Sequence, residues 1–157
     1  MSKVEERLAA LGHKVPVPGA PIANFVNTVR TGNLVFTAGQ GPRREDGQYD
    51  YIGKVGKDID VETARKSAEL VMLNCLGVLK QEIGDLDRVK RVVKVLGMVN
   101  CTPDFTDQPK VINGCSDMLH EIFGAKTDGW HARSALGFAA LPNGAAVEVE
   151  AIFEIKD

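Results

Sequence analysis

The strongest constraint on the fold lies near the carboxyl end, where residues 147–155 alternate between apolar and acidic side chains. Three valines or alanines, one phenylalanine and one isoleucine hold the odd positions, and three glutamates lie between them, with Ile152 as the one exception. Successive side chains of a strand point to opposite faces of its sheet, so the pattern predicts a strand with one face in a core. The sequence Leu141–Gly144 predicts a turn before it, and an earlier strand is expected from His131 onward.

Two segments with apolar residues at three- and four-residue spacing predict helices that each turn one face toward a core. Asp60 is expected to cap the first helix and Gly84 to end it, while the second is expected from near Pro109 to Gly124. Between them, the valine-rich segment 89–99 predicts a strand that is buried largely on both sides.

The first third of the chain predicts a short amphipathic helix at about residues 2–12, followed by extended chain. Runs at 24–30 and 34–38 are joined through a glycine and favour a hairpin, and a further short extended piece is expected at 51–55. This order predicts an α+β fold in two layers, with a mixed β-sheet covered on one face by two helices. A length of 157 residues fits one domain. The second face of the sheet is expected to be either solvated or packed against copies of the chain.

Composition narrows the classes of function. The chain carries a net charge of −2 and has no broad basic footprint, so no nucleic-acid partner is expected. No apolar run approaches the roughly 20 residues that cross a bilayer, and no leader segment precedes the first helix, so we expect a cytoplasmic protein without a membrane partner. The three cysteines are dispersed and are expected to be buried reduced thiols. The histidines lack metal-ligand spacing, so no metal site is expected.

Two charged residues near the end of the chain are candidates for chemistry. Arg133 lies among small and apolar neighbours, and a guanidinium can hold a carboxylate through two parallel hydrogen bonds. Glu148 is a candidate to handle a water. Each residue also has a plainer interpretation, because Arg133 would serve equally in a salt bridge between subunits and Glu148 on a solvated face. Trp130 and His131 are interpreted either as packing and turn residues or as the rim of a pocket, with His131 as a proton shuttle.

Four segments of this chain resemble motifs of the YjgF/RidA family, and they occur in the family's order. They are Gly32–Gln40, the passage from Asn74 through Val78-Leu79 to Gly84–Val89, the pair Asp104-Phe105, and a terminal signature in which Ala132–Ser134 is followed by Leu141-Pro142 and Val147–Ala151. The resemblance covers about residues 20–155.

The resemblance implies a chorismate-mutase-like fold that assembles as a homotrimer around a barrel-like core, with active sites between subunits. It also implies hydrolytic deamination of small 2-imino acids and enamines such as 2-aminoacrylate, with no cofactor or metal. Two alternatives stay open: a non-catalytic protein that binds a small carboxylate metabolite such as a 2-oxo acid, and an RNA-cleaving translation inhibitor.

The resemblance also implies roles for individual residues. Arg133 would grip the substrate carboxylate, and Glu148 would position and polarise the attacking water. The Ala135 amide and the backbone at Gly39 would help to hold the substrate.

The chain departs from the family pattern at three of the expected site positions. Phe25 stands where the family has a tyrosine, and it is expected either to line the pocket or to fill a gap in the core. The family's asparagine aligns best with Ser116, with Asn113-Gly114 nearby as the alternative, and Ala135 stands where a cysteine often follows the Arg-Ser pair.

Overall fold

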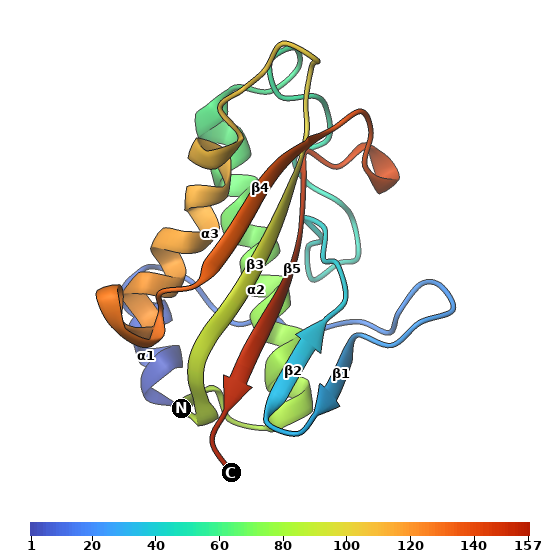
Figure 1. Ribbon diagram of the computed structural model, residues 1–157. Coiled ribbons are helices and arrows are strands. Elements are labelled where there is room, and N and C mark those ends of the chain that lie inside the picture. Colours follow the sequence, from blue (N-terminus) through green and yellow to red (C-terminus); the bar gives the residue numbers. More distant parts are fainter.

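The computed structural model describes residues 1–157 and contains one five-stranded mixed sheet (Figure 1). Its strands are β1 (Thr28–Thr31), β2 (Leu34–Thr37), β3 (Val89–Asn100), β4 (Ala132–Phe138) and β5 (Val147–Ile155). They lie in the order β1-β2-β5-β3-β4. Strands β3 and β4 run parallel, and the other neighbouring pairs run antiparallel. Although β4 and β5 follow one another in the chain, they are not neighbours in the sheet, because β3 lies between them.

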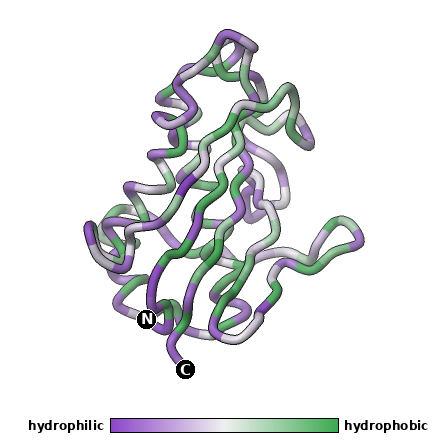
Figure 2. The backbone as a smooth tube through the Cα atoms, in the orientation of Figure 1, coloured by the Kyte–Doolittle hydropathy of each residue, from purple (hydrophilic) through white to green (hydrophobic).

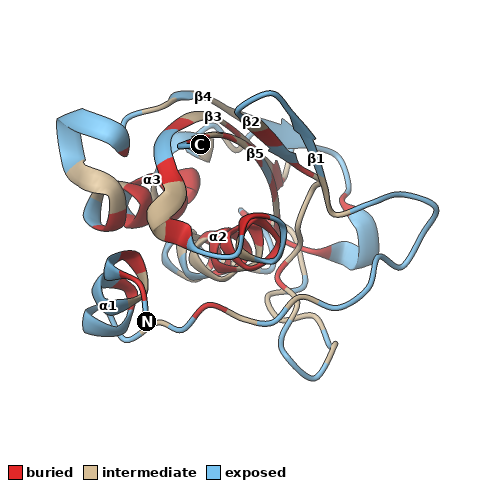
Figure 3. Cartoon of the chain, turned by 90° about the horizontal axis from the view of Figure 1, so that it is seen from below, coloured by how far each residue is buried: buried red, intermediate tan, exposed pale blue.

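Two long helices, α2 (Val61–Ile83) and α3 (Gln108–Phe123), cover one face of this sheet (Figure 3). The expected α+β architecture is therefore confirmed. The side chain of Asp60 accepts a hydrogen bond of 2.8 Å from the amide of Thr63, which caps α2 as expected. The short helix α1 (Lys3–Ala10) begins with a capping box between Ser2 and Glu5 and packs beside α3. Short 3-10 turns occur at Leu86–Arg88 and Pro142–Gly144, and an irregular turn spans Gly124–Asp128.

The core lies between the helices and the sheet, and one face of β5 packs into it, as the alternation of this strand predicted. The odd residues of that strand are buried, while the even ones, including Ile152, are partly buried or exposed. Figure 2 shows the hydropathy along the chain, with hydrophobic residues in the strands of the sheet. The prediction that β3 is buried largely on both sides was wrong for the single chain. Val92, Val95 and Val99 face the helices and are fully buried, but Leu96 and Met98 are only partly buried because no layer covers the second face.

The extended piece expected at residues 51–55 is not a strand of the sheet. Ile52 forms an isolated bridge with Ala145, and Val55 forms isolated bridges with Ile59 and Cys101. Tyr51 has a positive φ of 54°, and this left-handed turn interrupts any continuous pairing. The segment instead runs beside the ends of the sheet strands.

The chain before β1 follows an irregular course past α2 and then extends away from the helices (Figure 1). It approaches α2 at Gly77, where a β-carbon would lie 2.7 Å from the carbonyl oxygen of Pro16. Gly77 therefore allows the helix and this segment to come into direct contact.

The thiols of Cys75, Cys101 and Cys115 are reduced and buried, as expected. Burial raises the pKa of Cys75 to about 12 and raises that of Cys115 well above its usual value. No helix in the structure combines the length and the apolar character that a bilayer crossing requires.

Candidate functional site

A cleft of about 380 Å³ opens between the chain before β1, the loop that follows β2 and the start of β5. Ligand sites are commonly concave and largely apolar, with a few convergent polar groups. This cleft has that character. Its apolar wall comes from Pro16, Val17, Pro18, Ala20, Pro21, Ile22 and Phe25. Its polar groups include Arg43, Tyr49, Asn74 and Glu148.

Glu148 projects from β5 into this cleft and lies directly against Gly39. A β-carbon at Gly39 would collide with the Glu148 carboxyl group, so the glycine leaves the space that this group occupies. Burial raises the pKa of Glu148, and the negative charge of Glu150 on the same strand raises it further. A carboxyl group with a raised pKa can both hold and accept a proton closer to neutral pH.

Phe25 lines the same cleft and keeps 46% of its surface exposed, so it is not a filler of the core. Three of the predicted site residues, Gly39, Phe25 and Glu148, are therefore brought together within one chain.

The other predicted residues gather between α3 and the edge strand β4. Arg133 Nη1 donates hydrogen bonds to Asn113 Oδ1 at 2.8 Å and to Ser116 Oγ at 3.0 Å. Ala135 lies two residues further along β4 and packs against the core. Arg133 makes no ion pair with a carboxylate of its own chain.

The Arg133 and Glu148 side chains point to opposite faces of the sheet. Glu148 lies opposite Met98 of β3, and Met98 lies opposite Leu136 of β4, so these three share one face. Arg133 is three residues before Leu136 and therefore points the other way, toward α3. Arg133 and Glu148 of the same chain therefore cannot contact one small substrate, because their side chains lie on opposite faces of the sheet and β3 lies between their strands.

His131 belongs to the hydrogen-bonded support of Arg133. Its Nδ1 lies 2.7 Å from the Gly129 carbonyl oxygen, and its Nε2 lies 2.9 Å from Ser116 Oγ. Since a carbonyl only accepts, Nδ1 carries the proton of the neutral ring and Nε2 accepts from the Ser116 hydroxyl. Burial lowers the pKa of His131, and the nearby His120 and Arg133 lower it further, which favours this neutral form. The neighbouring Trp130 is 52% exposed.

Sequence reasoning missed Arg43 and Tyr49 as residues of the cleft. Both lie in a polar loop whose charges are typical of a solvated surface, so periodicity gives no signal there. The one clue is that the Arg43-Arg44 pair directly follows Gly41-Pro42 in the loop after β2.

The mixed sheet with helices on one face and a cleft at its strand ends defines an α+β domain of the YjgF type. Residues 5–153 match the family model described as "YjgF/chorismate_mutase-like, putative endoribonuclease", and the chain belongs to this family.

Similar proteins extend over nearly the whole chain. Protein TCP17 of Trypanosoma cruzi is 40% identical over 155 residues, which cover 99% of this chain and 96% of that protein. The crystal structure of Atu1372 from Agrobacterium tumefaciens, a protein of unknown function, is 42% identical with a TM-score of 0.90 and covers 98% of this chain and 93% of its own. A "putative endoribonuclease" from Shewanella oneidensis is 31% identical with a TM-score of 0.91 and covers 97% and 99%.

Proposed function

We propose that the protein hydrolyses small 2-imino acids and enamines, such as 2-aminoacrylate, to 2-oxo acids and ammonia, and that it needs no cofactor. The observation that carries this proposal is the Glu148 carboxyl group, which lies in the cleft beside Gly39 with a raised pKa. Membership of the YjgF family supports the proposal, because the terminal Arg-Ser and Val-Glu-Val-Glu segments contain the site residues Arg133 and Glu148.

Glu148 takes part in three proton transfers. In its protonated form it gives a proton to the methylene carbon of the enamine, which converts the substrate to an iminium ion. The resulting carboxylate then takes a proton from water while the water oxygen bonds to the iminium carbon. Collapse of this adduct breaks the carbon–nitrogen bond as that proton passes to the nitrogen, and the proton of the adduct's hydroxyl group goes to the departing ammonia, so a 2-oxo acid and ammonium result. Glu148 is left as a carboxylate and takes its next proton from solvent. An iminium carbon is already electrophilic, so positioning the substrate and the water supplies most of the catalysis.

The substrate carboxylate is held in this proposal by Arg133 of a second copy of the chain. Arg133 lies on an edge strand, lacks a carboxylate partner of its own, and is held in place by Asn113 and Ser116. The uncovered face of the sheet supports such an assembly because it exposes apolar side chains, among them Phe36 and Leu136. We propose a homotrimer, in which copies of this face pack together around a central core.

The test is a coupled assay in which a pyridoxal-phosphate enzyme generates 2-aminoacrylate and pyruvate release is followed. We expect the protein to accelerate pyruvate release and Arg133→Ala to abolish the acceleration. The loss of a bidentate charged contact costs about 1.5–3 kcal/mol for each hydrogen bond, which corresponds to at least a tenfold effect. Arg30→Ala is the matched control, since Arg30 is an exposed arginine outside the cleft whose Nε contacts only the Gly32 carbonyl oxygen.

Other outcomes would replace this function. If pyruvate release is not accelerated but 2-oxo acids raise the melting temperature, the protein is a metabolite-binding protein instead. If the purified protein cleaves RNA and Arg133→Ala leaves that cleavage intact, the endoribonuclease activity suggested by the family description replaces both.

A further inference from the structure

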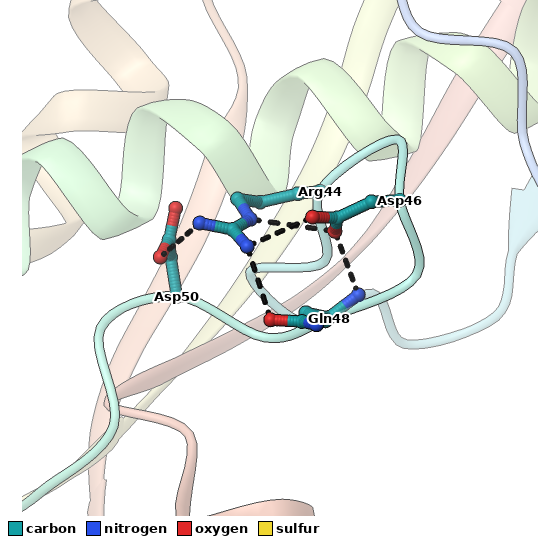
Figure 4. A network of polar contacts seen from close by, with 4 residues as sticks. All are labelled: Arg44, Asp46, Gln48 and Asp50. Carbon is teal, nitrogen blue, oxygen red and sulfur yellow. Dashed lines mark hydrogen bonds and ion pairs between the residues drawn. The ribbon is translucent and has the colours of Figure 1, made fainter.

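Two adjacent arginines in the loop after β2 differ sharply in their partners. Arg44 Nη2 contacts Asp46 Oδ2 at 2.8 Å and Gln48 Oε1 at 3.1 Å, while its Nη1 lies 3.4 Å from Asp50 Oδ1 (Figure 4). Its charge is matched within the loop, so Arg44 serves to fold residues 43–50 back on themselves.

The Arg43 side chain, by contrast, makes no hydrogen bond and no ion pair. Its guanidinium lies beside Gly19, where a β-carbon would be 3.2 Å from Nη1, and it is only partly exposed. The group carries five N–H donors in a fixed planar fork. Arg43 lines the same cleft as Glu148, so a partly buried cation faces the site with its donors free of protein acceptors.

The backbone at Arg43 is held in place by hydrogen bonds from a side chain of α2. Asn74 Nδ2 donates hydrogen bonds of 2.9 Å to the carbonyl oxygens of both Gly41 and Arg43. Across the loop, Arg43 forms an isolated antiparallel bridge with Tyr49. A cation held on such a support loses little freedom when it binds a ligand, and this favours affinity.

The cleft is larger than a three-carbon imino acid needs. Its volume of about 380 Å³ corresponds to roughly a dozen water molecules at about 30 Å³ each. The acidic lining residues Glu45 and Glu148 would repel a second negative charge on the substrate. Arg43 is the group in this cleft that offsets the repulsion, since the Arg44 charge is already paired.

We propose that Arg43 binds a second, distal carboxylate of the substrate, and that the cleft prefers imines and enamines of dicarboxylic acids over those of monocarboxylic acids. This inference rests on the proposed function, in which Arg133 of a second copy holds the first carboxylate. Arg43 then sets substrate choice from within the chain that provides Glu148.

The test measures binding of two stable product analogues of equal chain length by calorimetry. 2-Oxoglutarate carries the distal carboxylate, and 2-oxopentanoate lacks it. We expect the wild-type protein to bind 2-oxoglutarate at least about tenfold more tightly, as a charge-assisted fork contact predicts. Arg43→Gln is expected to remove this preference, and Arg43→Lys is expected to keep part of it, because lysine retains the charge without the fork.

Arg30→Gln is the control variant and is expected to keep the wild-type preference. Melting curves without ligand establish that each variant is folded, and Arg43→Lys keeps the test decisive if Arg43→Gln does not fold. Equal binding of the two acids by the wild-type protein overturns the inference, and so does a preference that survives Arg43→Gln. A deaminase that shows no dicarboxylate preference refutes only this inference. A preference that depends on Arg43, without accelerated release of a 2-oxo acid from either a monocarboxylic or a dicarboxylic imine, refutes only the proposed reaction.

Discussion

At the scale of single residues, the surroundings of Glu148 in the cleft disfavour the ionised form of its carboxyl group. Glu148 is placed beside Gly39 and near Glu150, and both burial and like charge raise its pKa from the usual 4.5. The folded protein therefore holds the Glu148 proton more tightly than the unfolded chain does. In the pH window between the ordinary and the raised pKa, the contribution of this group to stability falls as pH rises. A site residue that serves catalysis is thus expected to weaken the fold at neutral pH.

Glu148→Gln tests this conflict directly. The amide cannot ionise, so we expect the variant to melt at a higher temperature than the wild-type protein at pH 7 and to lose that advantage at pH 4. We expect deaminase activity to fall by about 10²- to 10⁴-fold, the usual contribution of a general acid–base group. Melting curves at both pH values and the coupled pyruvate assay provide the measurements. Glu121→Gln on the exposed surface of α3 is the control, and an equal gain there would contradict the explanation.

At the scale of elements, the packing of α2 against the chain before β1 sets one wall of the cleft. Gly77 allows this packing, and its replacement by alanine has two opposed effects. Alanine improves helix propensity by about 0.8–1 kcal/mol. Its β-carbon, however, would lie 2.7 Å from the Pro16 carbonyl oxygen, which is backbone and cannot swing aside. Overpacking of this kind typically costs about 1–3 kcal/mol, so the clash is expected to outweigh the gain in propensity.

Gly77→Ala should therefore lower the free energy of unfolding by up to about 2 kcal/mol, the difference between these terms. It should also weaken binding of 2-oxo acids, because Pro16 and its neighbours form the apolar wall. Urea unfolding and calorimetry measure the two effects. Gln81→Ala, at an exposed position one turn further along α2, is expected to change neither. A Gly77→Ala protein with increased stability would show that the segment moves aside at little cost.

The element scale also shows which features the sequence predicts and which it does not. The bounds of α2 followed from Asp60 and Gly84, and the burial of β5 followed from its alternation, because both signals are local. The placement of β3 between β4 and β5 has no local signal, since strand order depends on contacts between segments far apart in the chain. For the same reason, Arg43 had no pattern to mark it. Arg133 and Glu148 were identifiable as candidates, but their separation onto opposite faces depends on the register of three strands.

At the scale of the whole molecule, the sheet face opposite the helices has no cover within the chain. Val29, Phe36, Leu136 and Phe138 share this face, and each keeps more than a third of its surface exposed. Exposed apolar side chains on an uncovered sheet face are typical of a surface that contacts another protein. Because Arg133 and Glu148 cannot meet within one chain, the proposed reaction requires that copies associate.

Mixed assemblies test this requirement. Arg133→Ala and Glu148→Gln should each be inactive alone, but co-expression should produce some sites with Arg133 from one chain and Glu148 from another. Random mixing in a cyclic assembly gives each site both intact residues with a probability of about one quarter. We therefore expect about a quarter of wild-type activity, with the trimer mass verified by sedimentation. Mixed trimers that remain inactive would contradict a site that takes Arg133 from one chain and Glu148 from another.

The buried thiols have a consequence for how the protein meets oxidants and electrophiles. The thiolate is the reactive form of cysteine, and with a pKa of about 12 almost none of Cys75 exists in that form at neutral pH. Cys115 is equally enclosed, with its Sγ donating to the Ala68 carbonyl oxygen at 3.1 Å. Alkylating reagents can therefore reach Cys75 and Cys115 only when the core opens. The rate at which these two thiols are alkylated therefore measures how often the helices separate from the sheet in the native protein.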